Sequence, residues 1–176
     1  MKKILGNERA GKMNWMKKAV CCLLALACCA GVLLQAPVSA SAKASAKSLC
    51  KAALDVTGGS SQLKSQTTKA SDCPIFTMDQ SKKISSIAYL CDDKEVYSIC
   101  VAKVSKKSDA SDLYDSIKAY KDNNSNSNYL SDYSSTEQKV FKNAVYGKKG
   151  KYIWYIAMSP KKDVNKKGQD ALKQQL

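Results

Sequence analysis

The densest group of carboxylates in this chain is the short segment 92–95. Asp92, Asp93 and Glu95 stand together there, with Lys94 among them. Paired carboxylates can transfer protons or hold a metal cation, so the segment is a candidate site for a hydrolase or for cation binding. Asp is also a residue that turns favour, and two strand-like runs flank this segment. The turn is the simpler interpretation, and the site is kept as the alternative.

Histidine is absent from all 176 residues. Its absence removes the commonest general base and the commonest metal ligand. It also removes the usual partner of a catalytic Cys or Ser, and no G-x-S-x-G motif occurs. We therefore expect no catalysis and no cofactor, and we assign no catalytic, cofactor-binding or metal-binding residue.

The eight cysteines fall into two groups. Four lie in the N-terminal apolar segment, and the others are Cys50, Cys73, Cys91 and Cys100. In an exported chain, four such cysteines predict two disulfides, with three connectivities open. The alternative is that some are small buried hydrophobic residues. No C-x-x-C spacing follows residue 40, so neither a thioredoxin-like motif nor a zinc site of the usual spacing is indicated.

Residues 1–40 have the pattern of a secretory signal peptide. A basic start is followed by the uncharged apolar segment 19–34, and small residues precede Ala40 and Ala42, the two predicted cleavage sites. An uncleaved membrane anchor is one alternative, although such an anchor needs about 20 apolar residues.

Lipidation is the second alternative for the leader. Cys28 follows the small residue Ala27, as in a lipoprotein signal, although the apolar segment continues past it. In each case we expect an exported protein, secreted or associated with the cell envelope. A disordered tether is predicted over 41–47 and a single domain over 48–176.

The charge of the mature chain comes from lysine alone. Of 29 basic residues six precede residue 41, and of 15 acidic residues one does, so a net charge of +9 remains. Arg9 is the only arginine. Lysine lacks the planar fork with which arginine reads bases, so sequence-specific binding of nucleic acid is not expected.

Lysines are concentrated near the end of the chain, and the candidate contacts with a polyanion are Lys148, Lys149, Lys151, Lys161, Lys162, Lys166 and Lys167. The simpler interpretation of these lysines is a solubilising surface. The alternative hypothesis is weak attraction to an anionic cell-wall polymer or membrane surface. Because the two groups are close in sequence, we expect them to share one face.

The elements that would position these residues are two hairpins and several helices. In the run 152–159 both alternating faces are apolar, which predicts a central strand covered on both sides. It pairs with 140–146 across a loop that contains Gly147 and Gly150. A second hairpin is predicted from 84–91 and 95–104.

Helices are predicted at 48–56, ended by Gly58-Gly59, from about 109 to 121, and after Pro160. The Asn- and Ser-rich stretch 122–128 is expected to be a mobile loop. The predicted core consists of Phe76, Ile87, Ile99, Val101, Leu113, Ile117, Phe141, Val145, Ile153, Trp154 and Ile156. The fold class is α+β, a small antiparallel sheet of about four strands in two hairpins with helices packed on one face.

Three features carry a resemblance to a known family: Glu95 opening its strand, the helix near 111–121, and 143–158 with Gly150-Lys151-Tyr152 at its turn. Over about 95–172 the chain resembles a domain-of-unknown-function family of exported proteins and lipoproteins from Gram-positive, clostridia-type bacteria. Many members have a longer middle helix and a clear lipobox. The resemblance implies no activity, so we expect a non-catalytic cell-envelope or secreted domain with a binding or structural role.

Overall fold

Five antiparallel strands in the described part of the chain form one sheet, in the order β1-β2-β3-β5-β4. The computed structural model describes residues 44–176. The strands are β1 (Ser65–Thr67), β2 (Ile84–Cys91), β3 (Ser98–Val104), β4 (Val145–Lys149) and β5 (Tyr152–Ala157). The predicted leader, its cleavage sites Ala40 and Ala42, and the lipidation candidate Cys28 lie outside the described residues.

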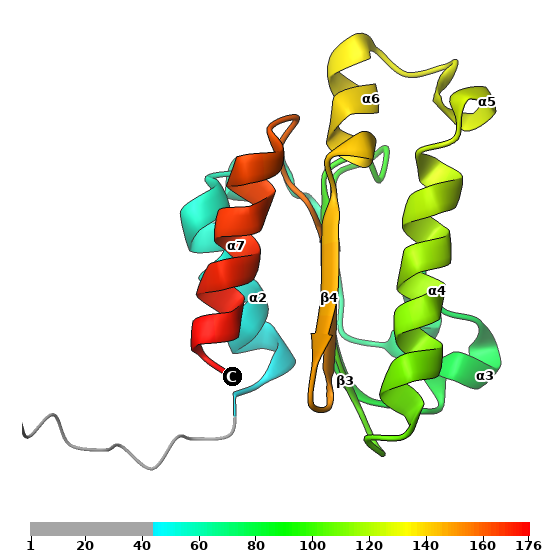
Figure 1. Ribbon diagram of the computed structural model, residues 1–176, viewed down its shortest axis with the longest axis vertical. Coiled ribbons are helices and arrows are strands. Elements are labelled where there is room, and N and C mark those ends of the chain that lie inside the picture. Colours follow the sequence, from blue (N-terminus) through cyan, green and yellow to red (C-terminus); the bar gives the residue numbers. More distant parts are fainter. Residues whose placement is uncertain (1–43) are drawn as a thin grey trace, which may run out of the picture. The chain divides into compact units, whose positions relative to one another are not determined.

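Helices cover both faces of this sheet, with α2 and α7 on one side and α4 and α6 on the other (Figure 1). The helices are α2 (Ala46–Thr57), α3 (Met78–Ser81), α4 (Asp109–Asn124), α5 (Ser127–Leu130), α6 (Ser135–Lys142) and α7 (Lys162–Gln174), with short 3-10 turns at Ser60–Gln62 and Ala70–Asp72. The predicted α+β class with an antiparallel sheet is confirmed. The placement of helices on one face is wrong, and β1 adds a fifth strand to the four expected.

Both faces need a cover because β5, which is hydrogen-bonded to strands on both sides, is apolar on both faces. Ile153 and Tyr155 pack in the core under α4 and α6. Trp154 and Ile156 pack in the core under α2 and α7. Every residue of the predicted core is buried.

The two predicted hairpins differ in how well their bounds agree with the structure. β2 covers the expected residues, while β3 begins at Ser98 because Asp92 closes a longer turn: its Oδ1 accepts the Tyr97 N–H at 3.1 Å.

The first half of 140–146, which was expected to be a strand, belongs to α6. Ser134 and Glu137 form a capping box there, and hydrogen bonds from Ser134 and Lys94 lower the pKa of Glu137 to about 2.

The polar stretch 122–128 is ordered into helix, contrary to the expected loop. α4 continues to Asn124, which is buried, and α5 begins at Ser127. The Asn126 side chain accepts the Asn128 N–H at 3.0 Å and caps α5. The stretch 122–128 has little apolar surface, and it is held by the Asn126 cap and by the neighbours that bury Asn124.

The N-terminal boundary of the domain lies earlier than predicted. α2 begins at Ala46 with a capping box made by Ser45 and Ser48, so residues 46 and 47 belong to a helix and not to a disordered tether. At its other end Gly58, at φ 69°, stops the helix as expected.

The cysteines Cys50, Cys73, Cys91 and Cys100 are free and buried, so the predicted disulfides are wrong for this structure. Cys50 packs against the face under α2 and α7, whereas the others pack under α4 and α6. Cys91 and Cys100 lie on paired strands but face Ser98 and Tyr89 across the ladder, a diagonal placement that separates their thiols. Burial raises the pKa of Cys50 to about 12.

Thiol titration tests whether the four cysteines are free or form disulfides. Without reductant, the unfolded protein should show all four thiols of residues 44–176, and the folded protein should react slowly because the thiols are buried and protonated. A coloured thiol reagent, added with and without denaturant, provides the measurement. Two or four fewer reactive thiols in the unreduced, unfolded protein than in the reduced one would show that disulfides do form.

Candidate functional site

A row of side chains crosses three strands at one end of the sheet. Tyr152 on β5 is paired with Lys103 on β3 and with Lys149 on β4, so the three side chains lie on one face. Lys103 Nζ lies 5.4 Å from the centroid of the Tyr152 ring, a cation–π contact. Two lysines are therefore held on either side of an aromatic ring.

A hollow of about 330 Å³ lies at this row, lined by Lys103, Lys149, Gly150, Lys151, Tyr152 and Leu176. Gly150, at φ 62°, allows the tight turn between β4 and β5. The Lys151 ammonium donates to the Ser105 carbonyl at 2.6 Å, and the Lys149 ammonium donates to the Lys173 carbonyl at 3.4 Å. Backbone carbonyls thus orient both lysines without neutralising them.

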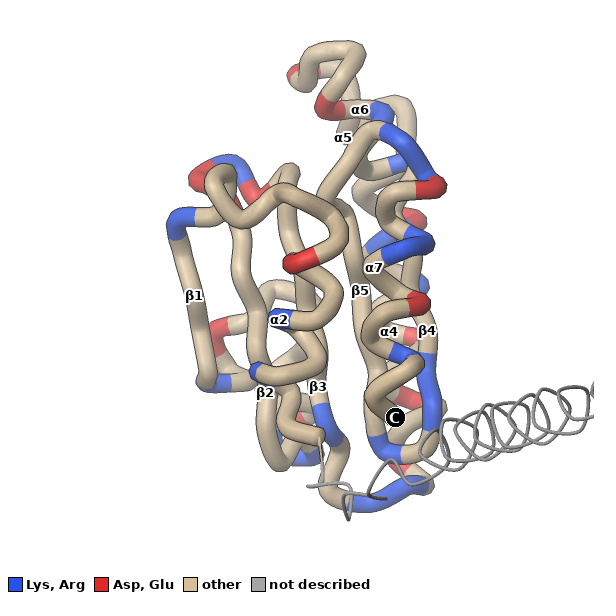
Figure 2. The backbone as a smooth tube through the Cα atoms, turned by 90° about the vertical axis from the view of Figure 1, so that its left-hand side faces the viewer, with Lys and Arg blue, Asp and Glu red and all other residues tan. Residues whose placement is uncertain are grey.

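Three further lysines lie near this end of the sheet without lining the hollow. Lys106 and Lys107 are exposed in the connection from β3 to α4. Lys148 points to the other face, where its ammonium donates to Ser111 Oγ at 2.7 Å and lies 4.8 Å from the Tyr114 ring centroid. We call Lys103, Lys106, Lys107, Lys148, Lys149 and Lys151 the lysine end (Figure 2).

No ion pair involves the lysine end within residues 44–176. Some lysines elsewhere pair with carboxylates, for example Lys83 with Asp112 at 2.6 Å and Lys64 with Asp93 at 2.6 Å, whereas others, such as Lys161, form no ion pair within the described residues. Six ammonium groups without a carboxylate partner make a positive field at this end, able to attract an anionic surface.

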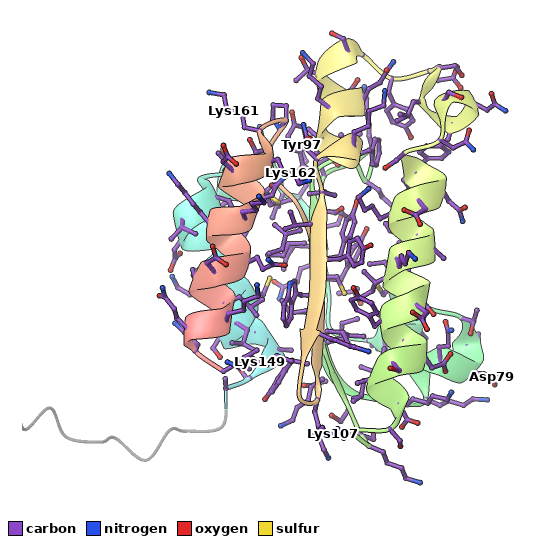
Figure 3. The ribbon with its side chains drawn as sticks, viewed as in Figure 1. Asp79, Tyr97, Lys107, Lys149, Lys161 and Lys162 are labelled. Carbon is purple, nitrogen blue, oxygen red and sulfur yellow. The ribbon has the colours of Figure 1, made fainter. Side chains whose placement is uncertain are left out.

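The seven lysines grouped by sequence do not share one face. Lys149 lies at the lower end of the sheet in Figure 3, whereas Lys161 and Lys162 lie at the upper end, beyond the far end of β5. Lys166 and Lys167 are exposed on α7. The expected common face is wrong because Lys148 and Lys149 point to opposite faces of the sheet, and the six residues of β5 separate Lys149 from Lys161 and Lys162.

The acidic segment 92–95 lies in the turn from β2 to β3, at the end of the sheet opposite the lysine end. Asp93 and Glu95 are exposed and Asp92 is half-buried, so the carboxylates are not buried together. Asp93 pairs with Lys64, and Asp92 accepts a backbone N–H. The exposure, the ion pair and the backbone hydrogen bond of these carboxylates are therefore consistent with a turn.

A second hollow, also of about 330 Å³, nevertheless opens beside this turn, lined by Ser65, Gln66, Thr67, Asp72, Tyr89, Cys91, Asp92, Asp93 and Glu95. We call it the acidic hollow. Burial raises the pKa of the Cys91 thiol, which disfavours the thiolate needed for nucleophilic attack. Within residues 44–176 no group of three or more His, Cys, Asp or Glu side chains could hold a metal ion. These contacts do not support the hydrolase alternative.

Tyr129 and Tyr133 stack at 5.4 Å between centroids and share a 3.2 Å hydroxyl hydrogen bond. Both rings meet the edge of Phe141, at 5.8 and 5.1 Å. Tyr129 is 44% exposed and Tyr133 is half-buried, so the pair covers the edge of the core at Phe141 while part of it faces solvent.

Sequence reasoning missed several residues of both hollows. Lys103 was assigned to a strand, and its approach to Tyr152 depends on the register between β3 and β5. Tyr89 was one residue of a predicted strand, and only its pairing with Thr67 brings it to the acidic hollow. Period-2 alternation could have put these residues on a face, but it does not tell which residue of another strand lies opposite.

Comparison with protein-family models, with curated proteins and with solved structures finds no match to this chain. The resemblance to the exported family therefore stays a prediction. Among the described helices, none combines the length and the apolar character that crossing a membrane requires.

Proposed function

We propose that this protein is an exported, non-catalytic domain that binds anionic surfaces of the cell envelope through its lysine end. The observation that carries the proposal is the gathering of six lysines at one end of the sheet, none in an ion pair within residues 44–176. Three of them line the hollow. Such a surface binds through many weak, screened contacts. Phosphate groups, whether of a wall polymer or of acidic lipids, are the matching chemistry.

The position of Ala44, the first described residue, supports an orientation in which the lysine end faces the anionic surface. The Tyr152 hydroxyl donates a hydrogen bond to the Ala44 carbonyl, so the first described residue lies beside the lysine hollow. An uncleaved leader, or a lipid on Cys28, would hold the lysine end close to the headgroups. A cleaved form would present the same lysines to wall polymer.

Salt-dependent sedimentation tests the proposal. The purified protein should sediment with vesicles that contain phosphatidylglycerol at low salt, and should be released at about 0.5 M salt, where the Debye length is only a few Å. Vesicles of phosphatidylcholine alone should retain little protein. A parallel assay with purified cell wall distinguishes the polymer from the lipid as the source of the anions. Binding that ignores salt, or no binding at low salt in either assay, would contradict the proposal.

A pair of charge-matched variants locates the surface. Replacing Lys103, Lys149 and Lys151 with Gln removes three charges at the lysine end. Each lysine near an acidic surface contributes about 1 kcal/mol, so affinity should fall by about 3 kcal/mol, or about 100-fold. The same change at Lys161, Lys162 and Lys166, outside the lysine end, should cost much less. Equal losses would show that only net charge matters, and thermal melts of both variants check folding.

A further inference from the structure

The hollow beside the turn from β4 to β5, here called the lysine hollow, has an apolar floor. Tyr152 and Leu176 line it, and both side chains are half-buried and pack against the core under α2 and α7. Tyr152 lies on the same face of β5 as Trp154, which belongs to that core. The hollow therefore leaves apolar surface accessible at the end of this core, and covering such surface with an apolar group is favourable.

Three lysines line the same hollow. Lys103 comes from β3, Lys149 from β4 and Lys151 from the turn. Lys149 and Lys151 each use one of their three donors on a backbone carbonyl, so further donors remain for a ligand. No Asp or Glu of residues 44–176 lines the hollow, and none of the three lysines forms an ion pair within that range. The lining thus complements a ligand that joins an anionic group to an apolar one.

The apolar floor distinguishes between the two sources of phosphate that could reach the lysine end. A wall polymer of sugar or polyol phosphates is polar along its length, so it would gain little from covering Tyr152 and Leu176. An acidic phospholipid carries acyl chains next to its phosphate, so it can contact the lysines and the apolar floor together. The chemistry of the lining therefore favours the lipid.

We propose that the lysine hollow binds one acidic phospholipid, with the phosphate against the three ammonium groups and the first methylenes of an acyl chain against Tyr152 and Leu176. The volume of about 330 Å³ is within the range of small-ligand sites, enough for this part of a lipid. This assignment rests on the proposed function and narrows the ligand from any anionic surface to a membrane lipid. The rest of the lipid stays in the bilayer, so the hollow adds a specific contact to the screened attraction of the lysine end.

Amide NMR with short-chain lipids tests this site. Dihexanoyl phosphatidylglycerol, kept below the concentration at which it forms micelles, should cause saturable shifts at residues 103, 149–152 and 176. Glycerol phosphate has the phosphate without acyl chains, and dihexanoyl phosphatidylcholine has the same chains without net charge. Each should bind about tenfold more weakly, or worse, because it satisfies only one part of the hollow. Equal affinity for either of these probes, or no saturable shift with phosphatidylglycerol, would overturn the proposal.

A change in the floor that leaves the charge intact makes the test specific. Leu176→Ser should weaken the binding of dihexanoyl phosphatidylglycerol about tenfold, because apolar contact is lost while every lysine remains. Val56→Ser is the matched control, since Val56 is 48% exposed and does not line the hollow. If Leu176→Ser binds the short-chain lipid as tightly as Val56→Ser does, the proposal fails. Thermal melts of both variants check folding.

The vesicle assay separates this proposal from the proposed function. Salt-dependent binding to phosphatidylglycerol vesicles without a saturable shift at the hollow would overturn the lipid site and leave the proposed function standing. A saturable shift at the hollow without binding to vesicles or to purified wall would support the lipid site and contradict the proposed function.

Discussion

Replacing Trp154 with Ala should lower the free energy of unfolding by about 3–5 kcal/mol, the usual cost of truncating a buried tryptophan. Trp154 is 1% exposed and lies on β5 in the core under α2 and α7. Its indole N–H donates to Gln169 Oε1 on α7 at 3.0 Å, so the ring joins sheet and helix. The free energy of unfolding of a domain is commonly about 5–15 kcal/mol, so this loss is a large share of it.

Chemical denaturation of the purified protein measures the effect. Met78→Ala is the control, because Met78 is 64% exposed and its truncation should change stability very little. The midpoint of denaturation should fall sharply for Trp154→Ala alone. An unchanged midpoint would mean that β5 does not carry this side chain into the core.

Replacing Gly147 with Ala should destabilise the protein by about 1–3 kcal/mol, the usual cost of overpacking. Gly147 pairs with Trp154 across β4 and β5, and a Cβ built at Gly147 would lie 2.4 Å from Cζ2 and 2.6 Å from Cε2 of the indole. The indole is rigid and fully enclosed, so it has little room to move. The absence of a side chain at Gly147 is what lets the ring lie against the strand.

A double-mutant cycle isolates this cause. In a Trp154→Leu background the indole is gone, so Gly147→Ala should cost much less there than in the natural protein. Gly150→Ala, in the same hairpin, is the matched control: nothing lies within 4 Å of its Cβ, and its cost of about 1–2 kcal/mol comes from φ 62°. That cost should be the same in both backgrounds. Equal penalties for Gly147→Ala in both backgrounds would show that the ring is not responsible.

Local features of the fold are predictable from the sequence because the interactions that make them are local. Ser134 and Glu137 are three residues apart, and they form a capping box in the structure. Gly58 ends α2 where a left-handed residue is needed. The period-2 alternation of 152–159 predicted a strand buried on both faces, and β5 is such a strand.

Features that depend on pairing between distant segments were missed. The alternation of 152–159 predicted a strand covered on both sides, but it did not show that α7 helps to cover one of them. Gly168 reads as a weakness in that helix, but a Cβ there would lie 2.7 Å from Thr57 Cγ2 on α2, so it permits close packing of the two helices. Asn165 is fully buried and accepts the Met158 N–H at 2.9 Å. Neither role follows from helical periodicity.

The α+β class, eleven residues of the core, and an excess charge after residue 40 that is carried by lysine alone all follow from the sequence. The tertiary structure alone decided that Lys149 and Lys161 lie at opposite ends, that the cysteines are unpaired, and that Tyr89 lines an acidic hollow. The physical reason is that burial and local hydrogen bonds depend on neighbours in the chain, whereas register and strand order depend on which distant residues pair. Both hollows are built from such pairs: Lys103 with Tyr152, and Thr67 with Tyr89.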